Sequence, residues 1–171
     1  GGGIANTLIA AKGYDVGKSL VEKSMLSEAK ELLDNPKIIL PNSVIVSDSP
    51  DKPGRETSID SIAKNEAIFD VAPESLTAIE PMLMNAGTIL WNGPLGFFEK
   101  ENFDKGTIQI AQMIISSKGF SVVGGGDTIL AAQKAGVLEK LDYVSTAGGA
   151  FLEFMEGRKL PAVEALKEKV N

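Results

Sequence analysis

The sequence predicts an α/β protein with three layers, in which helices cover both faces of a parallel sheet in a doubly wound arrangement. Two observations carry this prediction. Short apolar runs typical of strands alternate with apolar residues at helical spacing, and glycine turns join several of the strands to the next helix. A chain of 171 residues, 43% of them hydrophobic and 23% charged, can also bury a core. Right-handed crossovers between the parallel strands are expected by default.

The N-terminal elements are predicted from local patterns. Helical spacing predicts a helix over residues 4–11 and a second one with its apolar face on residues 25–33, for which Ser24 is a plausible N-cap. The branched apolar run at residues 44–46 predicts a buried strand. Residues 47–58, with two prolines and several charges, favour an exposed loop or a hairpin connection.

The middle of the chain combines proline signals with a strand. Pro73 is placed to occupy the first turn of a helix that runs through Leu83. Pro81 lies inside this helical pattern, so the helix should be kinked or split there. The apolar run at residues 88–91 predicts a strand that ends at the turn formed by residues 92–94.

The C-terminal part repeats the order of strand, glycine turn and helix. Asp104 could cap a helix over residues 108–115, and residues 120–123 predict a strand that ends in three glycines. Asp127 could then cap a helix that Gly136 ends. We expect one more strand at residues 143–146, a helix opened by Gly148 and Gly149 and ended by Gly157, and a final helix from Pro161.

Composition excludes several classes of site. The sequence has no Cys and no His, which excludes disulfides, Cys/His metal sites and every Ser-His or Cys-His dyad. Any metal must therefore be held by oxygen ligands. The net charge is −6 and no basic cluster is present, so nothing favours nucleic acid or an anionic membrane as a partner. No apolar run approaches the roughly 20 residues that a membrane span needs.

Three segments that are rich in glycine follow predicted strands, at residues 92–99, 124–128 and 145–150. Ligands of doubly wound sheets bind beyond the carboxyl ends of the strands. Glycine lets a ligand approach the backbone closely, and a helix that starts there presents free N–H groups and the positive end of its dipole. Phosphate is the natural ligand of such an edge, and three converging loops indicate it more strongly than one.

Each of these segments also has a purely structural interpretation. Residues 124–126 could form only a tight turn, Asp127 could be only an N-cap, and Gly148 and Gly149 could be only flexible residues before a helix. In the functional interpretation Asp127 binds Mg²⁺ and Thr128 offers a hydroxyl and an amide to a phosphate. The amides at Gly148 and Gly149 would then face a transferring phosphoryl group. Glu99 is either an ordinary surface carboxylate or an acceptor for ribose hydroxyls.

One nucleotide motif is rejected. Residues 13–19 resemble a Walker A loop, but only three residues separate the two glycines where the motif needs four, and the segment follows a predicted helix instead of a strand. The sequence also has no dinucleotide fingerprint with an acidic residue at the required spacing.

Motifs spread over the whole chain resemble the phosphoglycerate kinase family, in the same order. The pair formed by Trp-Asn-Gly-Pro and Gly-Gly-Gly-Asp-Thr is the most specific part. The matching segments are Gly1-Gly2-Gly3-Ile4-Ala5-Asn6-Thr7, Gly17-Lys18-Ser19-Leu20-Val21-Glu22, Leu90-Trp91-Asn92-Gly93-Pro94-Leu95-Gly96-Phe97-Phe98-Glu99, Gly124-Gly125-Gly126-Asp127-Thr128, Ser145-Thr146-Ala147-Gly148-Gly149-Ala150 and Glu156-Gly157-Arg158-Lys159-Leu160-Pro161.

The resemblance implies two Rossmann-like α/β domains joined by a hinge, with phosphoglycerate held by the N-terminal domain and Mg-ADP or Mg-ATP by the C-terminal domain. Residues 1–171 look like most of the C-terminal domain. We therefore expect a piece of a longer protein, with an incomplete sheet because the first strand of the domain is missing. A tag remnant is the alternative explanation of the initial glycines.

The resemblance also implies the roles of individual residues. Glu99 would bind the ribose, Asp127 the magnesium ion and Thr128 a nucleotide phosphate, and the amides of Gly148 and Gly149 would stabilise the transferring phosphoryl group. The adenine pocket and the rest of the nucleotide site would be formed by Gly2, Gly3, Asn92, Pro94, Gly96, Phe97, Gly125 and Gly126.

The implied reaction is reversible phosphoryl transfer between 1,3-bisphosphoglycerate and ADP, which gives 3-phosphoglycerate and ATP in the cytoplasm. The whole protein is expected to be monomeric. The chain alone is expected to be inactive, because the N-terminal domain and its basic substrate pocket are absent. Ala147, Ala72 and Tyr143 depart from the residues usual in the family. A non-catalytic nucleotide-binding module and a different nucleotide-dependent enzyme remain as alternatives.

Overall fold

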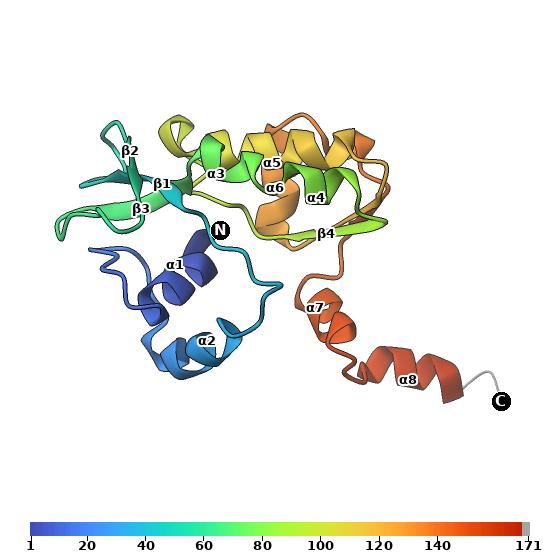
Figure 1. Cartoon of the computed structure of the whole chain (residues 1–171). Helices are drawn as coiled ribbons and strands as arrows, with labels where there is room; N and C mark the ends of the chain where they lie inside the picture. The colour runs from blue at the N-terminus through green and yellow to red at the C-terminus, as the bar shows by residue number, and fades with distance from the viewer. Residues whose placement is uncertain (169–171) are drawn as a thin grey trace.

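A computed structural model of the chain describes residues 1–168. In this part the chain forms eight α-helices and six β-strands (Figure 1). The helices are α1 (Gly2–Ala11), α2 (Leu26–Leu32), α3 (Pro73–Thr77), α4 (Glu80–Met84), α5 (Lys105–Ser116), α6 (Gly126–Lys134), α7 (Gly149–Met155) and α8 (Pro161–Glu168). The strands are β1 (Ser43–Ser47), β2 (Arg55–Ser58), β3 (Ala67–Val71), β4 (Thr88–Asn92), β5 (Phe120–Gly124) and β6 (Tyr143–Ser145).

The predicted parallel sheet consists of β4, β5 and β6 in that order. The register pairs Asn92 with Gly124 and Gly124 with Ser145, so all three strands end at the same edge of the sheet. Among the described residues β4 pairs only with β5, which agrees with the expectation of an incomplete sheet. The three glycine segments therefore begin side by side.

A second, antiparallel sheet has the order β2-β1-β3. The predicted strand at residues 44–46 lies at its centre as β1, and β2 forms within the segment that was expected to be a loop or hairpin. The strand β3 was not predicted. Its apolar run is interrupted by Asp70, which is buried although it carries a carboxyl group.

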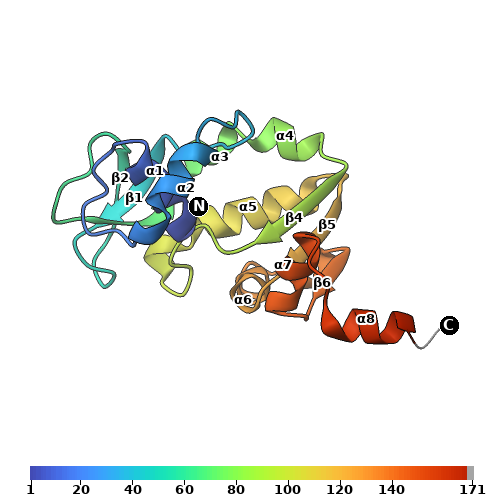
Figure 2. The ribbon, with the colours of Figure 1, turned by 90° about the horizontal axis from the view of Figure 1, so that it is seen from below.

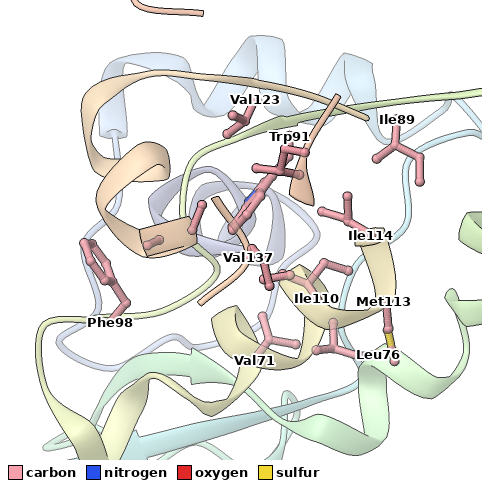
Figure 3. Close-up of a cluster of buried hydrophobic side chains, with 14 residues drawn as sticks. Val71, Leu76, Ile89, Trp91, Phe98, Ile110, Met113, Ile114, Val123 and Val137 are labelled. Atoms are coloured by element: carbon pink, nitrogen blue, oxygen red, sulfur yellow. The ribbon is translucent and has the colours of Figure 1, made fainter. Parts of the chain in front are cut away.

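The larger hydrophobic core lies between the parallel sheet and helices α3 to α6 (Figure 3). Side chains alternate along β4, so Ile89 and Trp91 are buried in this core while Leu90 points to the opposite face. Val123 of β5 is fully buried beside Trp91. The core thus fixes the orientation of the strands that carry the edge loops.

On the opposite face of the parallel sheet, α7 covers the carboxyl ends of the strands. Phe151 of α7 packs directly over Gly124, where a Cβ atom would overlap the aromatic ring. Farther from this end, Leu90, Phe120 and Tyr143 are about half exposed. The last helix, α8, extends away from the rest of the chain in both views (Figure 2). No helix within residues 1–168 is long and apolar enough to cross a membrane.

Helix ends confirm some of the expected signals. The predicted helix of residues 73–83 is split into α3 and α4, with Pro73 at the start of α3 and Pro81 in the first turn of α4. Gly136 and Gly157 follow α6 and α7 in the left-handed conformation, with φ of +68° and +79°. Both glycines end their helices as predicted.

Of the three expected N-caps, only Asp104 lies at an N-cap position. Ser24 lies inside a 3₁₀ turn, Lys23–Met25, and its hydroxyl donates to Glu22 instead of capping α2. The N-cap position of α6 is taken by Gly125, so Asp127 lies within the first turn. Asp104 does occupy the N-cap position of α5, but its carboxylate pairs with Lys134.

Candidate functional site

The cleft with the predicted site residues lies between the N-terminus of α1 and the segment that follows β4. This segment, residues 93–99, is called the rim loop below. The cleft has a volume of about 770 Å³. Its lining includes eight of the residues predicted from the sequence, namely Gly2, Gly3, Asn92, Pro94, Gly96, Phe97, Glu99 and Asp127.

The start of α1 is bonded to the rim loop across the cleft. The backbone N–H of Gly2 donates to the carbonyl oxygen of Leu95 at 2.9 Å. Gly2 has φ of +62°, and a Cβ atom at this position would lie 3.3 Å from the carbonyl oxygen of Pro94. Glycine is thus favoured here by the left-handed backbone conformation, and a Cβ atom would also make a tight contact with the rim loop.

The rim loop is supported from below by buried side chains. The hydroxyl oxygen of Thr128 accepts from the N–H of Gly93 at 2.7 Å. The hydroxyl oxygen of Thr107 accepts from the N–H groups of Leu95 and Gly96 at 3.1 and 3.2 Å. Both threonines are only 1% exposed, so neither hydroxyl is accessible from the cleft in this structure.

The rim loop is also tied to β3 and α6. The N–H of Phe97 donates to the carbonyl oxygen of Phe69 at 2.7 Å. The Lys134 ammonium group donates to the carbonyl oxygen of Phe98 and lies 2.8 Å from the Asp104 carboxylate. The loop is therefore held by β3, α5 and α6, and its backbone groups are preorganised.

The second glycine segment joins the rim loop at the sheet edge. The side-chain amide of Asn92 donates to the carbonyl oxygen of Gly124 at 2.7 Å. Gly125 has φ of +93°, which turns the chain from β5 into α6. Asp127 is exposed and lines the cleft, whereas Gly125, Gly126 and Thr128 do not line it.

The third segment, with Gly148 and Gly149, lies at the end of β6 beside the second one. Both glycines are exposed, Gly148 has φ of +57°, and neither lines the cleft. The packing of Phe151 over Gly124 links α7 to the end of β5. The structure thus brings all three segments to one sheet edge but only the first two to the cleft.

Three charged side chains line the cleft, which are Lys18, Glu99 and Asp127. Lys18 is the one basic residue among them and was not predicted as a site residue. Its signal was present in the segment Gly17-Lys18-Ser19, which was rejected as a Walker A loop and counted among the segments that resemble the family, but no role was assigned to Lys18. Lys18 places a positive charge where a polyphosphate could approach.

A metal ion would find few protein ligands here. Within residues 1–168 no group of three or more Asp or Glu side chains could hold a cation. The Asp127 carboxylate makes no ion pair or side-chain hydrogen bond with any described residue. One accessible carboxylate fits Mg²⁺ that takes its other ligands from phosphates and water.

Asp70 lies behind the rim loop and outside the cleft lining. Its carboxylate accepts from the N–H of Val71 at 2.9 Å and from the N–H of Gly106 at 2.8 Å. Burial raises the pKa of Asp70 to about 7, because desolvation outweighs these two bonds and the nearby Asp104 adds a smaller increase. A Cβ atom on Gly96 or Gly106 would collide with this carboxyl group.

A parallel sheet with glycine segments at one edge, beside a cleft, is the arrangement of a Rossmann-like α/β domain, a class of domain whose ligands bind at the carboxyl ends of the strands. The family model described as phosphoglycerate kinase matches residues 1–158. The chain belongs to the phosphoglycerate kinase family.

Solved structures agree with this assignment. The chain is similar to the phosphoglycerate kinase of Coxiella burnetii, with 45% identity and a TM-score of 0.94 over 100% of this chain and 46% of that one. It is also similar to the phosphoglycerate kinase of Pyrococcus horikoshii, with 34% identity and a TM-score of 0.83 over 95% of this chain and 43% of that one. The chain thus spans less than half the length of these two structures.

Proposed function

We propose that residues 1–171 form most of the C-terminal domain of a two-domain phosphoglycerate kinase and bind Mg-ADP or Mg-ATP in the cleft. The observation that carries this proposal is the convergence of eight sequence-predicted residues on one cleft of about 770 Å³. Clefts that hold small molecules have volumes of roughly 300–1,000 Å³. A nucleotide is therefore of a suitable size for this cleft.

The proposed binding mode follows the chemistry of the lining. The flat glycine surface of Gly2 and Gly3, opposite Pro94 and Gly96, would hold the adenine ring, and Glu99 would accept hydrogen bonds from the ribose. The polyphosphate would extend toward Asp127, where bound Mg²⁺ would offset its negative charge. In this mode the amides at the start of α6, which include Gly126 and Thr128, would add the positive end of the helix dipole.

The proposed reaction is reversible phosphoryl transfer between 1,3-bisphosphoglycerate and ADP. This chemistry depends on positioning and on charge neutralisation at the moving group. In this proposal the amides of Gly148 and Gly149 face that group, while the N-terminal domain of the same chain would bind the phosphoglycerate. We place the reaction in the cytoplasm, as a step of glycolysis, in a monomeric protein.

The 171-residue chain is expected to lack kinase activity, because in this proposal the phosphoglycerate substrate binds to the N-terminal domain. Closure of a second domain would also be needed to exclude water from the reactive acyl phosphate. A coupled assay of the purified chain is the measurement. Turnover comparable with that of the complete enzyme would contradict the proposal that the two substrates bind to different domains.

Nucleotide binding is tested by titrating ADP into the chain with Mg²⁺ and with EDTA. We expect binding to depend on Mg²⁺ and to weaken by about tenfold in Asp127→Ala, which corresponds to about 1.4 kcal/mol. Glu139→Ala is the matched control, because Glu139 is exposed and lies outside the cleft lining.

The alternative is a non-catalytic module that holds a nucleotide through adenine contacts. One observation favours it: Gly148 and Gly149 do not line the cleft, so the cleft by itself offers a nucleotide only the contacts of the first two segments. Such a module would bind ADP equally well with EDTA and would be insensitive to Asp127→Ala. Equal affinities in all these titrations would favour the module over the kinase domain.

A further inference from the structure

We propose that Thr107, a buried residue outside the cleft lining, is a positioning residue that sets the separation of the two cleft walls. One wall is the N-terminus of α1 and the other is the rim loop. The geometric part of the proposal concerns the chain alone. Its consequence for nucleotide affinity rests on the proposed function.

The Thr107 hydroxyl orients two successive peptide groups by hydrogen bonding. Its oxygen accepts from the N–H of Leu95 at 3.1 Å and from the N–H of Gly96 at 3.2 Å. The described residues contain no cis peptide bond, and in a trans peptide the carbonyl points opposite to the N–H of the next residue. Thr107 therefore turns the carbonyls of Pro94 and Leu95 away from α5.

These two carbonyls meet the start of α1. The Leu95 oxygen accepts from the N–H of Gly2 at 2.9 Å. The Pro94 oxygen is the nearest atom to the position of a Cβ on Gly2, at 3.3 Å. A chain of hydrogen bonds thus runs from Thr107 through the rim loop to Gly2, and it crosses from one wall of the cleft to the other.

The base of this chain is fixed by β3. The residue before Thr107, Gly106, donates its N–H to the Asp70 carboxylate at 2.8 Å, and Phe97 donates to the carbonyl of Phe69. Gly96 and Gly106 both approach the Asp70 carboxyl group too closely to admit a Cβ atom. A movement of α5 at Thr107 would therefore displace β3 as well. The Thr107 hydroxyl is thus a fixed reference point for the rim loop.

The experiment compares Thr107→Val, which keeps the shape but removes the acceptor, with Thr107→Ser, which keeps the hydroxyl. Amide hydrogen exchange at Leu95, Gly96 and Gly2 is measured in the 171-residue chain, together with its affinity for Mg-ADP. Thr77→Val is the matched control, because Thr77 is a helical threonine on an exposed surface.

In Thr107→Val we expect exchange at all three amides to accelerate by about tenfold and Mg-ADP affinity to fall by about tenfold. Exchange at Ile114, farther along α5, should not change. Thr107→Ser should restore exchange and affinity to within about twofold of the original chain, and Thr77→Val should leave them unchanged.

Three results would overturn the proposal. The first is unchanged exchange at Gly2, which would break the link to α1. The second is equal acceleration at Ile114, which would mean general destabilisation. The third is unchanged affinity in a chain whose rim amides exchange faster. If the original chain binds no Mg-ADP, the proposed function fails, while the exchange data still decide the geometric claim.

A folding failure of Thr107→Val would not end the test. Thr107→Cys replaces the hydroxyl by a thiol, which is a weak acceptor. We then expect exchange at Leu95, Gly96 and Gly2 to be faster in Thr107→Cys than in Thr107→Ser. Equal rates in these two variants would overturn the proposal.

Discussion

At the scale of single residues, Asp70 couples the stability of the chain to pH. Its pKa is raised from the usual 3.8 to about 7 by burial, although the N–H groups of Val71 and Gly106 favour the charged form. The folded chain therefore holds a proton that the unfolded chain has lost between these two pH values. The stabilisation is complete below the unfolded pKa and is lost as the pH rises through about 7.

The corresponding prediction concerns Asp70→Asn, which cannot titrate. Between pH 5.5 and 7.5 the free energy of unfolding of the original chain should fall by about 2 kcal/mol more than that of the variant. Urea unfolding at several pH values measures both slopes. The comparison cancels other titrating groups, such as Asp142, whose lowered pKa acts at more acidic pH. Parallel slopes would show that Asp70 is charged in the folded state.

At the scale of elements, α7 packs on the parallel sheet through Phe151. Phe151 is 8% exposed and lies over Gly124, the last residue of β5. We expect Phe151→Ala to destabilise the chain by about 3 kcal/mol. Gly124→Ala should also be strongly destabilising, because the new methyl group occupies the space of the ring.

The two changes should not be additive. In the double variant the alanine methyl group at residue 124 enters space that the missing ring has vacated. Denaturant unfolding of both single variants and the double variant should give a double variant more stable than the sum predicts, by about 1 kcal/mol or more. Additive effects would mean that α7 is held elsewhere. Exchange of the Gly148 and Gly149 amides reports whether α7 moves.

The edge loops were predictable because each follows a short apolar run with a local glycine signal. Residues 124–128 are an example, since strand, turn and helix are adjacent in the sequence. The strand β3 was missed because Asp70 interrupts its apolar pattern, and its carboxylate is satisfied by Gly106, which lies 36 residues away. Local periodicity carries no information about such a partner.

The candidate site shows the same difference between local sequence signals and long-range contacts. The resemblance to a family named Gly2 and Asp127, and the cleft contains both. The functional interpretation of residues 124–128 offered the Thr128 hydroxyl to a phosphate; in this structure that oxygen accepts from Gly93 and is buried. Thr107 carried no signal, because its role depends on how α5 packs under the rim loop. Residues proposed to contact a ligand can be recognised from local sequence motifs. Residues that support such a motif can be recognised only from the tertiary packing.

At the scale of the whole molecule, the buried side chains form two separate clusters. The larger one surrounds Trp91 and Val123 between the parallel sheet and its helices. The smaller one lies between α1 and the antiparallel sheet, with Val46 fully buried in it. Hydrogen bonds of the rim loop to Gly2 and Phe69 join the two regions. Because the two clusters have no buried side chain in common, we expect them to unfold at different denaturant concentrations.

Trp91 is the single tryptophan of the chain, so its fluorescence reports only on the larger cluster. Val123→Ala should lower the urea midpoint of Trp91 fluorescence, since it removes buried methyl groups at a cost of about 2 kcal/mol. Val46→Ala removes the same groups from the smaller cluster. It should accelerate amide exchange in β1 while leaving the Trp91 midpoint nearly unchanged. Equal shifts of that midpoint in both variants would show one cooperative unit, in which the rim loop transmits the loss of either core to the other.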